Sequence, residues 1–262
     1  MVIIHPEYAY LILEVNELKD EIADLLVERD TLLFFVCKDL RIDYMLKIGS
    51  LEYKLIVAEN NCKKNQRKLE IIKQKQKEKK KISLKSIQKQ IDSEFEKNNF
   101  EENEWSDLVD LAIDASSVEL FDYDKIEEMN IDYFKLHKMY NPVLNLKSSD
   151  ETNKLYKKIR NYYQKQNYKK LHKLAENYDE NDIFQDEISN LKFIREKYEE
   201  FSFEIKKQIR RIKNTFPYNQ KTILEDENLY RRKKDNLNKI ILEKNLENEK
   251  IIKKIDNILK KI

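Results

Sequence analysis

Residues 7–36 read EYAYLILEVNELKDEIADLLVERDTLLFFV, and their pattern decides the fold class. Apolar side chains recur at alternating steps of three and four residues, with Arg29 as the interruption: Leu11, Val15, Leu18, Ile22, Leu25, Leu32 and Val36. This spacing is the heptad seam along which long helices pack against one another. Proline is suited to the first turn of a helix, so we expect the helix to begin near Pro6.

A second seam follows in residues 44–72, after Cys37-Lys38-Asp39, which we interpret as a tight break. Two helices joined by a short link pack antiparallel, so the spacing predicts a helical hairpin over 7–78, within an N-terminal domain of residues 1–90. Residues 183–262 carry two further seams on either side of the turn signal at 216–219. They predict a second hairpin, which forms a C-terminal domain of residues 181–262.

Composition favours the same fold class. The chain of 262 residues contains one glycine, whereas hairpin sheets and doubly wound nucleotide folds need several at their turns. Charged residues make up 38% of the chain, against roughly 25% in an ordinary globular domain. Such a chain suits long solvated helices. We therefore predict an all-α, elongated protein in which two antiparallel coiled-coil hairpins surround a small helical module.

Charges of opposite sign are separated along the chain, although 51 basic and 49 acidic residues nearly cancel. Residues 63–89 are basic, whereas 92–128 are acidic; we interpret 91–124 as a linker and 73–81 as a helix end or a mobile segment. The basic stretch either contacts nucleic-acid phosphates without sequence preference, or it is an exposed helix tip matched to the acidic segment. The candidate phosphate-binding residues are Lys63, Lys64, Arg67, Lys68, Lys73, Lys75, Lys77, Lys79, Lys80 and Lys81.

No motif in the sequence indicates catalysis. The three histidines have no metal-ligand spacing, and Cys37 and Cys62 provide neither a disulfide framework nor a four-ligand zinc set. Phosphate-binding loops, dinucleotide fingerprints and nucleophile elbows are missing. We therefore expect no enzyme activity, no cofactor and no metal, and we expect Cys62 to be a core residue. The cysteine content and the lack of a secretory signal or a long apolar run predict a cytoplasmic chain without a membrane partner.

Residues 125–180 are predicted to form the small module. A helix is expected from about Asp124 to Met139, because Pro142 ends it and Ser148-Ser149-Asp150 offers caps for the next helix. That second helix carries apolar residues from Leu155 to Tyr163. A bend at Gln166-Asn167 then precedes a third, short helix.

The run YFKLHKMYNPVLN, residues 133–145, resembles helix II and the following loop of a J-domain, in which a basic helix leads into His-Pro-Asp. Residues 44–53 and 216–218 resemble segments of a family of uncharacterised bacterial proteins in which a J-like module is flanked by coiled coils. The resemblance implies that the loop and the basic helix face bind a protein partner. The residues concerned are Lys135, His137, Lys138, Asn141, Pro142 and Val143.

The chain departs from the J-domain pattern at two positions of the tripeptide. Asn141 stands in place of the motif His, and Val143 in place of the Asp, while Pro142 is kept. In active J-domains the tripeptide stimulates ATP hydrolysis by a partner chaperone, and a valine cannot supply the charge-assisted contact of the carboxylate. The resemblance therefore implies a degenerate module that keeps its fold and loses the stimulation. The alternative interpretation is that NPVLN is an ordinary loop between helices.

These observations predict a non-enzymatic adaptor that binds a protein partner, whose identity the sequence does not reveal. The alternative is a nucleic-acid or ribonucleoprotein binder that uses residues 63–89, such as an inhibitor of a nuclease complex of the kind that mobile elements, bacterial or phage, encode. A third interpretation is self-association into a homo-oligomer through exposed seam residues.

Overall fold

The computed structural model describes residues 6–116, 121–145, 148–178 and 187–260. Within these ranges the regular structure is helical and contains no strand, so the predicted all-α class is confirmed. The chain divides into two compact units. Unit 1 contains residues 1–39 and 120–219, and unit 2 contains residues 40–119 and 220–262.

The N-terminal helical backbone continues without a break from Pro6 to Lys77. Its parts are α1 (Pro6–Thr31), a π-helical turn (Leu32–Val36), α2 (Cys37–Tyr44), a second π-helical turn (Met45–Gly49) and α3 (Ser50–Lys77). The start at Pro6 is as predicted. The predicted break at Cys37-Lys38-Asp39 is wrong, because these residues lie in α2, where neither proline nor glycine interrupts the helix. The wider π-helical turns shift the apolar face without ending the helix.

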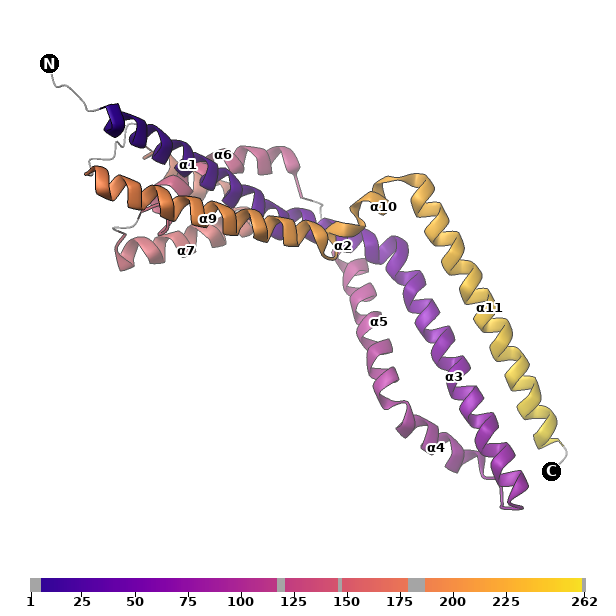
Figure 1. Cartoon of the computed structure of the whole chain (residues 1–262). Coiled ribbons are helices and arrows are strands. Elements are labelled where there is room, and N and C mark those ends of the chain that lie inside the picture. Colours follow the sequence, from indigo (N-terminus) through magenta and orange to yellow (C-terminus); the bar gives the residue numbers. More distant parts are fainter. Residues whose placement is uncertain (1–5, 117–120, 146–147, 179–186, 261–262) are drawn as a thin grey trace. The chain divides into compact units, whose positions relative to one another are not determined.

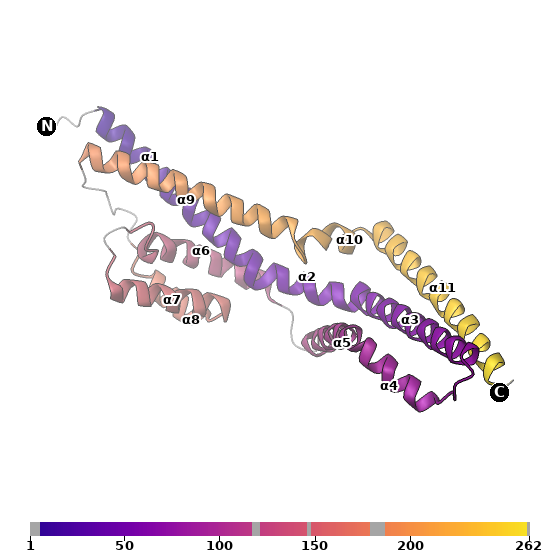
Figure 2. The same cartoon turned by 60° about the horizontal axis from the view of Figure 1, so that its bottom comes forward.

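In unit 1, α1 packs along α9 (Ile188–Asn214), and the two helices run parallel (Figures 1 and 2). Buried seam residues such as Val15 and Ile22 of α1 share a core cluster with Tyr198 and Ile205 of α9. Ion pairs flank this seam at every seventh residue of α1: Glu7–Lys192, Glu14–Arg195, Glu21–Lys206 and Glu28–Lys213. Pairs with this period are the flanking contacts of parallel heptad packing.

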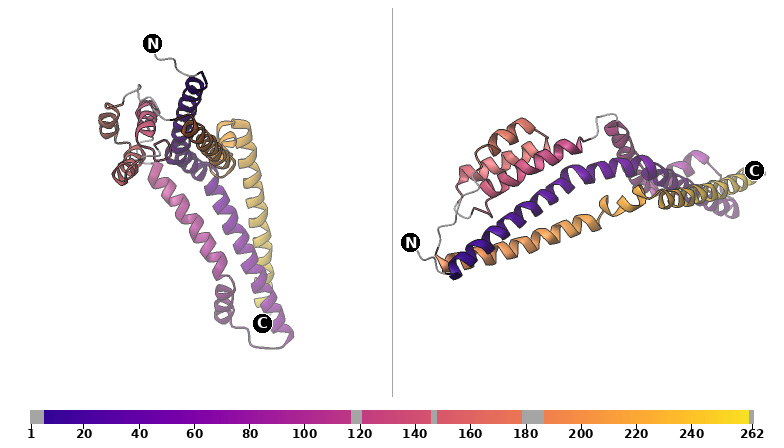
Figure 3. Two further views of the ribbon diagram at one scale, coloured as in Figure 1. Left: turned by 60° about the vertical axis from the view of Figure 1, so that its left-hand side comes forward. Right: turned by 90° about the horizontal axis from the view of Figure 1, so that it is seen from above.

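Three shorter helices complete unit 1: α6 (Tyr123–Tyr140), α7 (Asp150–Gln164) and α8 (Tyr168–Ala175). They lie on the side of α1 opposite α9 (Figures 2 and 3). Their core includes Leu136, Ile159 and Leu171, none of which is exposed. The predicted boundaries are confirmed, because α6 ends before Pro142 and the Ser149 hydroxyl accepts the Thr152 N–H at the start of α7.

Unit 2 has the same arrangement as unit 1, in which a central helix packs along a parallel long helix on one side and against shorter helices on the other. Its central helix, α3, runs parallel to α11 (Glu227–Leu259), with Glu52 3.3 Å from Lys233 and Asn65 donating to Asn248 at 2.8 Å (Figure 1). On the other side of α3 lie α4 (Leu84–Glu94) and α5 (Glu96–Ser116). A short 3-10 turn (Tyr218–Gln220) and α10 (Lys221–Glu225) precede α11, in agreement with the turn predicted near Pro217.

The predicted hairpins are wrong in their pairing. The seams of 7–36 and 44–78 do not cover each other, because α1 packs on α9 and α3 packs on α11. The two helices of 183–262 likewise belong to different units. All four seams have only a helical spacing in common, so spacing does not specify which helices pair. The expected domains of 1–90, 125–180 and 181–262 therefore do not coincide with the units.

The acidic segment is not the predicted linker. Residues 96–116 form α5, whose Trp105 and Ala112 pack with Leu51 and Leu55 in one core cluster. The Asn60 side chain of α3 donates to Glu102 at 3.1 Å. An acidic sequence with few apolar residues is typical of a linker. Here, however, Trp105 and Ala112 are enough to pack the helix against its neighbours. Residues 117–120 of the expected linker lie outside the described residues.

Candidate functional site

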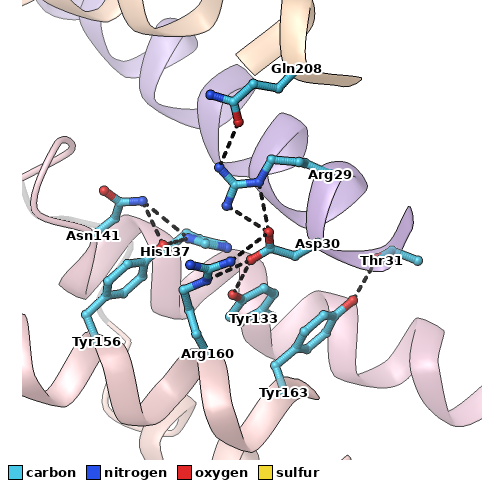
Figure 4. A network of polar contacts seen from close by, with 10 residues as sticks. All are labelled: Arg29, Asp30, Thr31, Tyr133, His137, Asn141, Tyr156, Arg160, Tyr163 and Gln208. Carbon is cyan, nitrogen blue, oxygen red and sulfur yellow. Dashed lines mark hydrogen bonds and ion pairs between the residues drawn. The ribbon is translucent and has the colours of Figure 1, made fainter. Parts of the chain in front are cut away.

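A buried carboxylate organises the contact of α1 with α6 and α7. Asp30 has no exposed surface, and its two oxygens accept hydrogen bonds from Arg29 (2.8 Å), Tyr133 (2.8 Å) and Arg160 (3.2 and 3.3 Å) (Figure 4). Two guanidinium groups therefore surround one carboxylate. Hydrogen bonds to charged partners of this kind are stronger than neutral ones. Arg29 also donates to Gln208 of α9 at 3.4 Å, so the cluster links α9 as well.

Tyrosine side chains extend the cluster between the helices. The rings of Tyr133 and Tyr163 are stacked, with their centroids 3.9 Å apart. The Tyr163 hydroxyl donates to Asn130 of α6 and lies 2.7 Å from the Thr31 hydroxyl of α1. Burial, followed by the charge of Asp30, raises the pKa of Tyr133 well above its usual value. Burial also raises the pKa of Tyr163. Both phenols therefore stay protonated and act as hydrogen-bond groups rather than as bases.

His137 lies completely inside this cluster. Burial lowers its pKa to about 3, and the nearby guanidinium groups of Arg29 and Arg160 act in the same direction, against the charge of Asp30. The ring is therefore neutral near pH 7. Its Nδ1 atom lies 3.0 Å from the Tyr156 hydroxyl and 3.5 Å from the Asn141 amide nitrogen.

Two asparagines build the loop after α6. The Asn141 side chain is buried; its oxygen accepts the Val143 N–H at 2.9 Å, and its nitrogen donates to Tyr156 at 3.0 Å. The Asn145 side chain donates to the carbonyls of Lys138 and Asn141, each at 3.0 Å. These bonds satisfy carbonyls that a helix leaves unpaired at its C-terminus. The NPVLN loop is thus shaped by its own asparagine side chains.

The structure separates the six residues predicted to bind a partner through the loop and the basic helix face. His137 and Asn141 are inside the unit, and Pro142 and Val143 are half-buried. Lys138 pairs with Asp20 of α1, and its ammonium group lies 5.6 Å from the ring centroids of both Phe134 and Tyr178. Lys135 lines a shallow groove of about 550 Å³ between α6 and α8. These residues therefore do not form one basic face.

The basic stretch is divided between two environments. In its first half, Arg67 forms a two-point contact with Glu94 of α4, at 2.7 and 3.1 Å, which lowers the pKa of Glu94 to about 2. Lys63 lies 3.9 Å from Glu59. Lys64, Lys68 and Lys75 are half-buried, whereas Lys73, Lys77, Lys79, Lys80 and Lys81 are exposed. The acidic segment thus contacts the body of α3, and the exposed lysines lie at its end.

The cysteines occupy ordinary packing positions. Cys62 is buried in the cluster between α3, α4 and α11, as predicted for a core residue, and burial raises the pKa of its thiol. Cys37 is half-buried. In the part of the chain that the structure describes, no group of three His, Cys, Asp or Glu side chains is arranged to hold a metal ion. No described helix combines the length and the apolar character that a bilayer span requires.

The chain matches no protein-family model, no curated protein and no solved structure.

The sequence patterns did not reveal the cluster around Asp30. Its main partners, Tyr133 and Arg160, are 103 and 130 residues away along the chain. One local signal exists: Arg29 takes a position of the otherwise apolar seam, within four polar residues in succession, Glu28 to Thr31. Polar residues at seam positions are costly unless they are paired, so such a run indicates partners elsewhere in the chain.

Proposed function

We propose that this chain is a non-enzymatic adaptor that binds a helical protein segment, and that its J-like module does not stimulate a chaperone ATPase. The observation that carries the adaptor proposal is an exposed apolar stripe on α5. Phe100 and Leu111 are 65% and 63% exposed, and Leu108 is 37% exposed. Their spacing places them along one side of α5, next to the half-buried Trp105 and the buried Ala112.

Catalysis by the Asp30 cluster is disfavoured by its burial. Asp30, Tyr133 and His137 have no exposed surface, so a substrate cannot reach them. Their hydrogen bonds join α1 to α6 and α7. Polar groups with this geometry fix one packing arrangement of helices, which is a structural task.

The burial of His137 and Asn141 also supports the proposed loss of chaperone stimulation. A positive docking face would need Lys135, His137 and Lys138 at the surface together. Instead, His137 is neutral inside the unit, and Lys138 is paired with Asp20. Asn141 is committed to the Val143 backbone and to Tyr156.

The charge around the exposed apolar residues of α5 supports a partner of basic character. Glu101, Glu104 and Asp107 are exposed beside Phe100, Leu108 and Leu111 (residues that form the α5 stripe). A helix with an apolar face and lysine or arginine flanks complements both features, since helix-in-groove contacts rely on apolar anchors and opposite charges steer the encounter. We therefore propose a basic amphipathic helix as the partner segment.

The adaptor proposal is tested with two synthetic helical peptides of about 20 residues, long enough to form a helix. Both carry the same leucine face, with lysine flanks in one and glutamate flanks in the other. By fluorescence anisotropy, the lysine peptide should bind the full chain and the glutamate peptide should not. The triple variant Phe100→Ser, Leu108→Ser, Leu111→Ser should weaken binding by roughly tenfold or more, because three apolar contacts are lost.

The matched control for this variant is Ile131→Ser, which changes a side chain on α6 that is 61% exposed and should leave peptide binding unchanged. Equal binding of both peptides, or an α5 variant that binds as well as the wild type, would contradict the adaptor proposal.

The proposed lack of chaperone stimulation is tested by measuring steady-state ATP turnover of a chaperone that J-domains stimulate. The wild-type chain should leave turnover at its basal rate, while an intact J-domain in the same assay accelerates it. Strong acceleration by this chain, abolished by Pro142→Ala, would show that the loop is active and would overturn the proposal.

A further inference from the structure

One end of unit 2 carries a dense basic surface. Residues 73–89 form the last turn of α3, the following loop and the first part of α4, and they contain eight lysines and one glutamate. The exposed lysines among them are Lys73, Lys77, Lys79, Lys80, Lys81, Lys85 and Lys89. The glutamate, Glu78, already pairs with Lys80 at 2.8 Å. We call this surface the lysine tip.

The final turns of α11 lie at the same end of unit 2, near the end of α3 (Figures 1 and 2). Ile251 and Ile255 of α11 share a core cluster with Ile72 of α3 and with Ile87 and Ile91 of α4. These five side chains are buried, so the three segments are held together by apolar packing. The exposed Lys253 and Lys254 of α11, and Lys260 directly after it, therefore add positive charge to the lysine tip, against one exposed acidic residue, Asp256.

The acidic segment, residues 92–128, does not neutralise the positive charge of the lysine tip. The contacts of that segment with α3 are made at Asn60 and Arg67, on the α5 and α4 sides of the helix body. On α4 itself, Glu94 is paired with Arg67, and Asp92 contributes one negative charge after Lys89. The tip thus keeps an excess of positive charge although the whole chain is nearly neutral.

We infer that the lysine tip binds the phosphate backbone of double-stranded nucleic acid, an activity beyond the proposed adaptor function. Neither residues 73–89 nor residues 250–260 contain Phe, Tyr or Trp, so the tip offers no platform on which unpaired bases stack. Lysine acts on phosphate as a point charge and carries little base readout. A duplex concentrates more phosphate charge than a single strand, so it is the favoured ligand, without sequence preference.

The test measures anisotropy of a labelled duplex DNA with the full chain at about 50 and about 200 mM salt, across which phosphate-dominated binding falls steeply. We expect binding at the lower concentration and a marked loss at the higher one. A second duplex of unrelated sequence should bind equally well. The tip variant carries Lys73→Gln, Lys77→Gln, Lys79→Gln, Lys81→Gln and Lys85→Gln. It should reduce affinity by roughly tenfold or more, and the salt slope should fall by about 0.9 for each phosphate contact removed.

The control variant removes the same charge from exposed lysines of unit 1: Lys154→Gln, Lys157→Gln, Lys158→Gln, Lys165→Gln and Lys173→Gln. It should bind the duplex like the wild type. Equal losses in both variants, or no duplex binding by the wild type at the lower salt concentration, would overturn the inference. Tighter binding to poly-glutamate or to phosphatidylserine vesicles than to the duplex, at equal charge concentration, would also overturn it. The α5 stripe is unchanged in the tip variant, so peptide binding tests the adaptor proposal separately.

Discussion

At Asp30, a carboxylate with no exposed surface accepts hydrogen bonds from two guanidinium groups and one phenol. A buried charge is costly to remove from water, and removing one partner leaves the others uncompensated. Asp30 therefore adds little net stability. Its main effect is to favour one packing arrangement of α1, α6 and α7 over the alternatives.

The variant Asp30→Asn should lower the free energy of unfolding by about 3 kcal/mol, because Arg29, Arg160 and Tyr133 lose their charged acceptor. Urea unfolding followed by circular dichroism measures this loss. The matched change Asp43→Asn removes an exposed carboxylate 2.9 Å from Lys47, and it should cost less than about 0.5 kcal/mol. Similar costs for both variants would mean that the cluster does not hold unit 1 together.

His137 makes stability depend on pH. Its pKa in the folded chain is about 3, below its usual value of roughly 6.5, so the unfolded chain binds more protons between these values. Stability is therefore complete above pH ~6.5 and is lost as the pH falls toward 3. Between pH ~7.5 and ~5.5 the wild type should lose about 1.4 kcal/mol more than the variant His137→Gln. Parallel pH profiles of the two proteins would show that the imidazole is not buried as a neutral group.

At the scale of elements, α4 and α5 depart furthest from the linker that their acidic sequence predicts. Ile87 and Ile91 hold α4 against α3 and α11, and Trp105 and Ala112 hold α5. Each of the two helices is therefore held by a small number of apolar contacts.

Hydrogen exchange followed by mass spectrometry tests this packing. Amides of 84–94 and 96–116 should be protected in the wild type, because their helical hydrogen bonds open only when the packing fails. Ile91→Asp should accelerate exchange across α4 and leave α1 and α9 unchanged. The control Ser93→Asp, on the exposed side of α4, should have little effect. Fast exchange of both segments in the wild type would restore the linker interpretation.

The sequence predicts most of the helices because their apolar periods and caps are local. Pro6, Ser149 and Pro142 mark boundaries where the structure places them. The break at 37–39 was wrong because two π-helical turns shift the seam, and a shift in period resembles an interruption. The Asp30 cluster could not be predicted, since it joins residues that are distant along the chain and share no motif.

At the scale of the whole molecule, both units follow one plan. A segment of the long N-terminal helix lies between a parallel C-terminal helix and the helices that intervene in sequence (Figure 3). Seam spacing alone fits an antiparallel hairpin equally well. The deciding signal is the charge pattern, because Glu7, Glu14, Glu21 and Glu28 recur with the heptad and α9 supplies the matching basic residues. That signal is in the sequence, but it is recognisable only when the two helices are compared.

Cross-linking between pairs of introduced cysteines tests this pairing most directly, in a background of Cys37→Ser and Cys62→Ala. A bifunctional maleimide should match the roughly 8–10 Å between packed helix axes. The parallel arrangement predicts cross-links within one chain for Glu21→Cys with Lys206→Cys, and for Glu52→Cys with Lys233→Cys. Efficient cross-linking of Glu21→Cys with Glu59→Cys, which an antiparallel N-terminal hairpin would bring together, would contradict it.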